Sequence, residues 1–303
     1  MNLTEAFQSL DAQGLNDDPT VYFIPGFAIL ILLEIIVSNW QHLKVHVWKD
    51  SAASIGMGIG SLFIGVVVKT IAFGLMVYVH QYAIFDIGYQ WWAWVILFFA
   101  DDFCMYWHHR LSHDIRLLWA AHINHHSSMN YNLAVALRQS WTEILYKYTF
   151  WMWLPLLGFE PLMIFTMISL NLIYQFWVHT KTIKSLGPLE LIFNTPSHHR
   201  VHHASNVRYL DRNMGGILII WDKLFGTFQK EEETDPVEYG LTSNIHTHNL
   251  FKIAFHEFGN ILKDVKRAPN VGSKLKYLFM PPGWSHDGST KTSRELRKEK
   301  GLM

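Results

Sequence analysis

Three long apolar stretches constrain the fold of this chain more than any other feature. A helix needs about 20 apolar residues to cross the hydrocarbon core of a bilayer, which is about 30 Å thick. The stretches are 21–38, a segment within 52–79, and one that runs from Trp91 into Asp102. Only 17% of the residues are charged, against roughly 25% in soluble domains. We interpret the stretches as membrane helices, since their length favours this over the alternative of core helices in a soluble α-protein.

A fourth apolar region, 148–178, is interrupted by Pro155, Gly158 and Pro161. Two interpretations are open: one long kinked helix, or a helical hairpin that enters the bilayer and returns. Proline breaks a helix, and closely spaced proline and glycine residues are typical of a turn. We therefore predict a broken helical hairpin, and about three to four transmembrane helices in all.

The basic residues set the predicted orientation. All but three of the 25 Lys and Arg residues lie after residue 100, and residues 1–20 contain none. Cytoplasmic loops of membrane proteins carry an excess of Lys and Arg. We therefore expect a non-cytoplasmic polar tail over 1–20, a membrane-embedded domain over 21–245 and a basic cytoplasmic tail over 246–303. Within that tail, residues 284–303 are expected to be disordered or to face lipid.

Histidine is strongly over-represented, with 18 residues, and eight of them form three short clusters. The first cluster has the pattern H-x-x-x-H, and the other two have H-x-x-H-H. On a helix, residues three and four apart lie on one face, about 5–6 Å apart at Cβ. Each cluster therefore presents two or three imidazoles on one face. The eight are His109, His113, His122, His125, His126, His199, His202 and His203.

Such a set of imidazoles predicts a metal site. Neutral imidazole is the commonest metal ligand in proteins and binds iron, zinc, copper or nickel. Eight ligands are too many for one ion and suit two, so we predict a dimetal site where the membrane helices end. His108 and His198 directly precede two of the clusters and would point about 100° away on a helix, so we expect neither to bind metal. His179, at the end of the fourth apolar region, is a candidate ninth ligand.

Metal-binding histidines usually donate their second ring N–H to a carboxylate or a carbonyl. Asp102 lies seven residues before His109, two helical turns away on nearly the same face, so we predict that it orients a histidine. Asp101 is its rival for this role. Asn194, five residues before His199, is predicted to play a similar polar role.

The order of the histidine motifs among apolar stretches resembles the fatty acid hydroxylase and sterol desaturase superfamily, and within it the alkylglycerol monooxygenase branch. The resemblance covers residues 90–245. It is carried by Asp102–His113, Leu118–Ser128, Tyr131–Ser140, Gln175–Thr180, Leu186–His203 and Ile219–Phe228.

This resemblance implies an all-α integral membrane protein whose cytosolic helical cap holds a di-iron centre on the eight histidines. The implied reaction is O2-dependent hydroxylation of a C–H bond in a membrane lipid. In the alkylglycerol branch the ether-bearing carbon is attacked and tetrahydrobiopterin is used; an electron-donor protein is the alternative. Asp114, directly after His113, stands where that branch has Glu and is implied to help place the pterin. The implied location is a bacterial inner membrane or the endoplasmic reticulum, with the site facing the cytoplasm.

Other functions remain open at this point. Desaturation, or hydroxylation of a sterol, fatty acyl chain or other bacterial lipid, would use the same site. A zinc-dependent membrane hydrolase would need a carboxylate beside its ligands, as in H-E-x-x-H, and only Asp114 is so placed. A metal transporter would carry its histidines within the spans. The net charge of zero gives no indication of a nucleic-acid partner, so we expect a membrane lipid, O2 and an electron donor as partners.

Overall fold

The structure is a computed structural model that describes residues 18–302. Its regular elements are helical, and two isolated β-bridges are the only strand-like pairings in this range. The predicted all-α fold is therefore confirmed, whereas most of the predicted 1–20 tail lies outside the described residues. The helices are α2 (Pro19–Trp40), α3 (Trp48–His80), α4 (Trp91–Asp114), α5 (Arg116–His126), η2 (Leu133–Leu137), α6 (Ile144–Lys147), η3 (Tyr148–Trp151), α7 (Trp153–Leu157), α8 (Pro161–Trp177), η4 (Gly187–Leu191), α9 (Pro196–His202), α10 (Ile220–Phe225), α11 (Leu250–Arg267), α12 (Val271–Phe279) and α13 (Ser293–Glu299).

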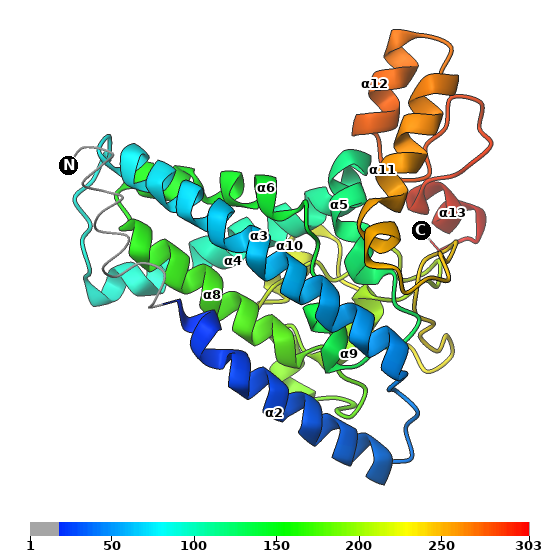
Figure 1. Cartoon of the computed structure of the whole chain (residues 1–303), viewed down its shortest axis with the longest axis horizontal. Helices are drawn as coiled ribbons and strands as arrows, with labels where there is room; N and C mark the ends of the chain where they lie inside the picture. Colours follow the sequence, from blue (N-terminus) through cyan, green and yellow to red (C-terminus); the bar gives the residue numbers. More distant parts are fainter. Residues whose placement is uncertain (1–17, 303) are drawn as a thin grey trace.

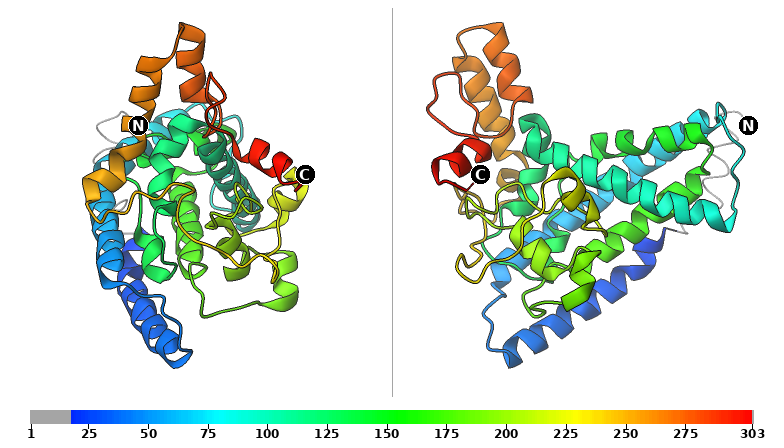
Figure 2. Two further views of the ribbon diagram at one scale, coloured as in Figure 1. Left: turned by 90° about the vertical axis from the view of Figure 1, so that its right-hand side faces the viewer. Right: turned by 180° about the vertical axis from the view of Figure 1, so that it is seen from behind.

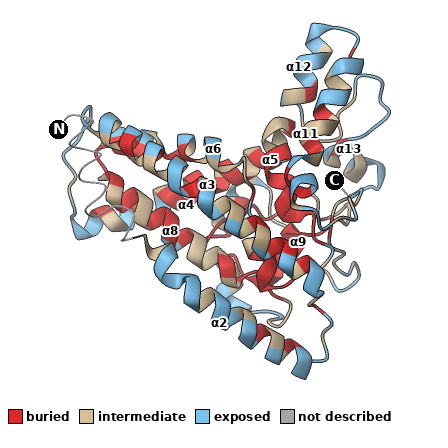
Figure 3. Ribbon diagram, in the orientation of Figure 1, coloured by how far each residue is buried: buried red, intermediate tan, exposed pale blue. Residues whose placement is uncertain are grey.

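Two helices, α2 and α3, are long and apolar enough to cross a membrane, with mean hydropathies of 2.3 and 2.2. They lie along the outside of the helical bundle; α2 is mostly exposed, and α3 exposes one side and packs with the other (Figures 1 and 3). An outward-facing apolar helix is expected where lipid is the solvent. The structure thus holds two candidate membrane helices within the described residues. α8 is apolar but shorter, so the number of about three to four spans stays a prediction.

The predicted break in the fourth apolar region is present. α7 ends at Leu157 and is capped by Gly158, whose φ of 110° suits glycine, and α8 begins at Pro161. A Cβ added to Gly158 would lie 2.0 Å from the carbonyl oxygen of Phe85, so only glycine fits at this turn. The segment that contains α6 runs away from α9, and α8 returns toward it (Figure 1). The chain therefore folds back as a broken hairpin, as predicted.

The main hydrophobic core lies between α3, α4, α7 and α8. Met76, Leu97, Leu154, Met163 and Ile164 are fully buried within it. This packing holds the last turns of α4 and the end of α8 beside α5 and α9, where buried residues gather (Figure 3). The core thereby brings all the histidine clusters to one end of the bundle.

The region after residue 245 is largely helical. α11 and α12 form a hairpin that projects from the bundle, and α13 follows near the C-terminus (Figure 2). The prediction that 284–303 is disordered is wrong over α13. Thr292 and Glu295 form a capping box there, and Arg297 donates to the carbonyl oxygen of Leu210. These contacts order a segment whose polar composition alone suggested disorder.

Candidate metal centre

Nine histidines meet at the end of the bundle and form two groups of buried side chains. Within each group the ligand atoms all lie within 4.8 Å of one another. All eight predicted residues are brought together, and His179 joins them. The first group is His109, His113, His122, His126 and His202; the second is His125, His179, His199 and His203.

Helical spacing explains how each element contributes. The last turns of α4 carry His109 and His113 four residues apart, so both face α5, against which α4 packs. α5 ends in a histidine triplet with i, i+3 and i+4 spacing. α9 is short and begins at Pro196, which is favourable at the first helical position because it needs no N–H partner. Neither group is built by one helix, because each needs α5 and α9 together.

Backbone carbonyls fix the tautomer of three of the imidazoles. Nδ1 of His109 lies 2.9 Å from the carbonyl oxygen of Met214, and Nδ1 of His202 lies 2.9 Å from that of Arg212. Nδ1 of His179 lies 2.7 Å from the carbonyl oxygen of Gln175. A carbonyl only accepts, so Nδ1 must carry the proton and donate. In the neutral ring Nε2 then holds a lone pair.

Two carboxylates act in the same way. Nδ1 of His122 lies 3.0 Å from Oε2 of Glu143, and Nδ1 of His113 lies 3.1 Å from Oδ1 of Asp211. Burial by itself raises the pKa of Glu143, but the neighbouring His122 and His108 outweigh it and hold that pKa well below its usual range. Glu143 is therefore an ionised acceptor. Such carboxylate–histidine pairs are common around protein-bound metals.

As a result, lone pairs face one another in the first group. Nε2 of His109 lies 3.1 Å from Nε2 of His122, although both rings carry their proton on Nδ1. Nε2 of His113 and Nε2 of His202 are buried and have no hydrogen-bond partner among the described residues. Burial lowers the pKa of His202 well below 6.5, which disfavours a second ring proton. A metal cation between these nitrogens satisfies them, so the donor set fits a bound metal.

The second group shows the same feature with fewer anchors. Nε2 of His179 lies 2.9 Å from Nε2 of His199 and 3.1 Å from Nε2 of His125. Nε2 of His203 lies 3.2 Å from that of His199. Several ring nitrogens again point at a common point, and neutral imidazoles suit iron, zinc, copper and nickel alike. The arrangement therefore fits a second metal ion, but the ligand type does not distinguish which metal is bound.

The structure places Asp102 away from the imidazoles. Its carboxylate accepts hydrogen bonds from the backbone N–H groups of Ile217 and Leu218 and from the indole of Trp221. The prediction that Asp102 orients a histidine directly is wrong. Its carboxylate is occupied by donors of the 217–221 segment and is not left free for an imidazole N–H. Asp101 accepts from Trp151 and is likewise engaged elsewhere.

The other predicted residues lie around the centre. Asn194 donates to the carbonyl oxygen of Gly215 and so fixes the loop that leads to Met214. Asp114 lies at the end of α4 beside Arg110 and is half exposed, with Oδ2 3.5 Å from the guanidinium Nε. Neither belongs to the two groups of possible ligands. His108 is outside them too, with Nε2 3.4 Å from Oε1 of Glu143.

Sequence reasoning missed Glu143 and Asp211, the two carboxylates that hold histidines. Glu143 precedes α6, and Asp211 lies in the loop after α9 with φ of 53°. They are 21 and 98 residues from their histidine partners. No helical periodicity joins such distant positions, so spacing could not reveal them.

Comparison with known proteins agrees with the geometry. Residues 94–227, which carry all nine histidines of both groups, match the profile of the fatty acid hydroxylase family. Residues 94–227 are therefore similar in sequence to the fatty acid hydroxylase family. The chain is 42% identical to the alkylglycerol monooxygenase of Homo sapiens over 86% of this chain and 58% of that protein. It is 31% identical to the ornithine lipid hydroxylase OlsE of Rhizobium tropici over 59% of this chain and 53% of that protein.

The chain thus spans 58% of the length of the vertebrate alkylglycerol monooxygenases that it matches. It is also 27% identical to the fatty acid hydroxylase vlmA of Lecanicillium over 53% of this chain and 50% of that protein. No solved structure matches the chain significantly. These fatty acid hydroxylase relatives differ in the lipid that their names give.

Proposed function

We propose that this chain is a di-iron monooxygenase that uses O2 to hydroxylate a C–H bond of a membrane lipid. The observation that carries the proposal is the convergence of nine buried imidazoles, five of which are fixed with an Nε2 lone pair toward the centre. Two irons held by these groups would supply activation of O2 for attack on an unactivated carbon. The similarity to the fatty acid hydroxylase family supports this chemistry over the other metals that imidazole binds.

The residues of this chain orient and shield the site. Glu143, Asp211 and three backbone carbonyls hold the imidazole rings, so the ligand geometry is set before metal or substrate arrives. The histidines are buried, which keeps bulk water from the reacting centre. We further propose that Asn194 supports the site by fixing the 215–216 loop and that Asp114, which is half exposed, contacts an electron donor or pterin.

We propose an alkylglycerol as substrate, attacked at the ether-bearing carbon, with tetrahydrobiopterin as reductant. Identities of 39–42% to vertebrate alkylglycerol monooxygenases over 86–88% of this chain support this choice. The resemblance to an ornithine lipid hydroxylase supports the alternative, in which another lipid is hydroxylated or desaturated at the same centre. Since α2 and α3 are candidate spans, we place the site at a membrane face, in a cap on the cytoplasmic side.

Metal analysis combined with an oxygen-dependent assay tests the proposal. Detergent-purified protein is analysed for iron and zinc and then given an alkylglycerol with and without tetrahydrobiopterin. Near two irons per chain with pterin-dependent aldehyde release is the expected result. Two irons without turnover would move the search to other lipids. Zinc alone, with turnover that needs no oxygen, would overturn the oxidative mechanism.

The contacts of the carboxylates disfavour the zinc hydrolase. That reaction needs a carboxylate free to take a proton from metal-bound water. Among the described residues, Glu143 and Asp211 are the carboxylates at the imidazoles, and both bind Nδ1 on the side away from the converging Nε2 atoms. They are therefore placed to orient ligands and not to act on a water at the centre.

A further inference from the structure

The α11–α12 hairpin carries an exposed apolar stripe. On α11, Phe251, Phe255 and Leu262 expose 68%, 43% and 60% of their surface, and on α12 Leu275 and Phe279 expose 51% and 57%. Within each helix these positions share one face. Exposed aromatic and leucine side chains on this scale mark an interaction surface and not ordinary solvent contact.

The opposite face of α11 is packed, and its two acidic groups pair with one arginine. Ile253 is buried against Ala53 and Met57 of α3, and Ile261 is buried farther along α11, which packs on α5. The hairpin has two acidic residues, Glu257 and Asp264, and both bind the guanidinium of Arg116, at 2.9 and 2.7 Å. This arginine fixes the hairpin to α5 and offsets one of the two negative charges.

Unpaired positive charge therefore dominates the outer surface of the hairpin. Its six basic residues are all exposed, and none forms an ion pair within the described part of the chain. Along α11 they lie on the side next to the apolar stripe. The six are Lys252, Lys263, Lys266, Arg267, Lys274 and Lys276.

The start of the stripe lies beside α3. Leu250, at the start of α11, contacts α3 at Gly56, where an added Cβ would lie 3.0 Å from its Cδ1. The ring of Phe251 packs edge-on against Trp141, which donates to the carbonyl oxygen of Met57 on α3. The start of the hairpin thus packs directly beside a candidate membrane helix.

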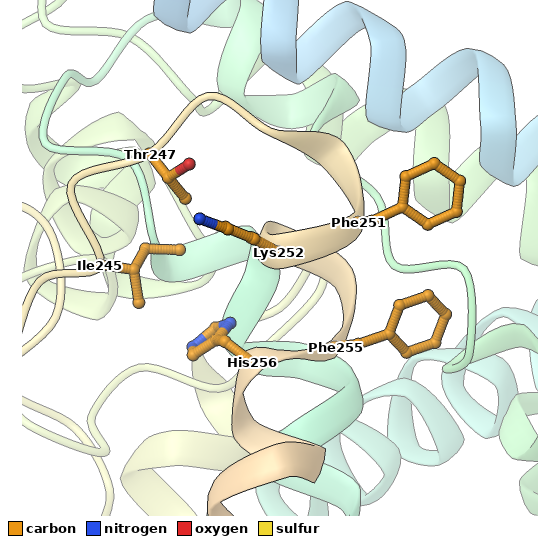
Figure 4. Close-up of a pocket in the computed structure, with 6 residues that line it drawn as sticks. All are labelled: Ile245, Thr247, Phe251, Lys252, Phe255 and His256. Atoms are coloured by element: carbon orange, nitrogen blue, oxygen red, sulfur yellow. The ribbon is translucent and has the colours of Figure 1, made fainter.

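A pocket at the start of α11 shows how the two kinds of side chain separate. Lys252, His256 and Thr247 lie on one side of the helix, and Phe251 and Phe255 point to the other (Figure 4). Nε2 of His256 is buried and has no partner among the described residues. The cationic Lys252 and the hydroxyl of Thr247 on one side, and aromatic rings on the other, match a phosphate headgroup and the acyl chains attached to it.

We propose that the α11–α12 hairpin lies on the bilayer surface and binds anionic phospholipids. The apolar stripe enters the boundary between headgroups and acyl chains, and the six cations bind headgroup phosphates. A helix with an apolar face flanked by Lys and Arg is the pattern of an interfacial membrane helix. A second copy of the chain is a poorer occupant, since it would bring the same positive charge. The proposal rests on α3 lying in the bilayer and is independent of the reaction.

Depth-dependent fluorescence quenching tests this placement. The full chain with Leu275→Cys is labelled with a polarity-sensitive dye and reconstituted in phosphatidylcholine vesicles with or without phosphatidylglycerol; Cys104 is buried and stays in place. Arg294→Cys, exposed on α13, is the matched control. We expect lipids brominated on the acyl chain to quench the Leu275 dye and aqueous iodide not to, with the reverse at Arg294.

Charge removal tests the choice of lipid. The variant Lys263→Gln, Lys266→Gln, Lys274→Gln is used once it is shown to retain its helical circular dichroism. In it, the increase in acyl-chain quenching at Leu275 that phosphatidylglycerol produces should fall about fivefold for each removed cation. An unchanged increase would overturn the anionic preference. Iodide quenching at Leu275 equal to that at Arg294 would overturn the membrane placement. Protection of Leu275 from both quenchers would also overturn it, in favour of a protein partner.

Discussion

The two histidine groups share a chemistry but differ in how firmly their rings are held. In the first group, four of the five rings have an Nδ1 partner outside the group, and two of these partners are carboxylates. In the second group His179 alone has such a partner among the described residues, a backbone carbonyl, and Nδ1 of His125 and His199 is buried without one. Ligands that are held in advance bind metal more tightly. The first position should therefore be the tighter and more rigid of the two, and the second the one free to change its geometry.

Loss of a ligand should have the largest effect, and it should be equally severe in the two groups. His202→Ala removes a ring from the first group, and His125→Ala removes one from the second. Each should abolish turnover, because both positions serve one reaction, and lower iron from about two to about one per chain. Iron analysis and activity of protein that remains in the membrane measure this. Full activity in either variant would remove that histidine from the site.

The next effect separates the two positions. Glu143→Gln removes the charge that holds His122 and should weaken metal binding at the first position by about 10- to 100-fold. In the wild type, a chelator should strip the second position first; in the variant the order should reverse, which time-resolved iron release would record. Glu190→Gln is the matched control, since Glu190 accepts from Ser197 and Thr195 and is not among the possible ligands. Unchanged release kinetics in Glu143→Gln would contradict the proposed asymmetry.

The difference between the groups also explains what sequence could predict. The eight histidines of the three clusters follow helical periodicity, so spacing alone predicted that they come together, whereas His179 belongs to no cluster. The partners of the rings obey no such rule. Glu143 reaches His122 because the hairpin folds back, and the carbonyl oxygen of Met214 belongs to a loop. The all-α fold and the turn at residues 155–161 were likewise visible as local patterns. The sequence did not reveal which nearby carboxylate faces a histidine, as the wrong prediction for Asp102 shows.

Acid should lower the folding stability through the histidines of both groups alike, because burial affects both. The two groups should therefore differ in how their rings are held and not in how they respond to pH. Burial lowers the pKa of His126, His202 and His203 well below 6.5. In the unfolded chain these rings take up protons as the pH falls through about 6.5, while the folded protein does not. Folding stability should therefore be full above this pH and decrease below it.

The measurement is the thermal unfolding midpoint of iron-free protein at about pH 7.5 and about pH 5.5. We expect a lower midpoint at the acid pH, and a similar decrease in Glu143→Gln, because that carboxylate stays ionised throughout this range. A midpoint that rises on acidification would mean that the rings bind protons in the folded state. Protons would then bridge the facing ring nitrogens, and their geometry would no longer indicate a metal site.

The smallest effect should come from the outermost contact of the first group. Ser293 on α13 donates to Oδ2 of Asp211, whose Oδ1 accepts from His113. Ser293→Ala leaves the carboxylate in place but removes one of the two bonds that aim it, so iron release from the first position should quicken by less than in Glu143→Gln. Ser289→Ala, on an exposed loop away from the centre, is the control. An effect as large as that of Glu143→Gln would show that α13 holds the metal centre as firmly as the buried carboxylate does, because Asp211 would then depend on this single hydroxyl for its position.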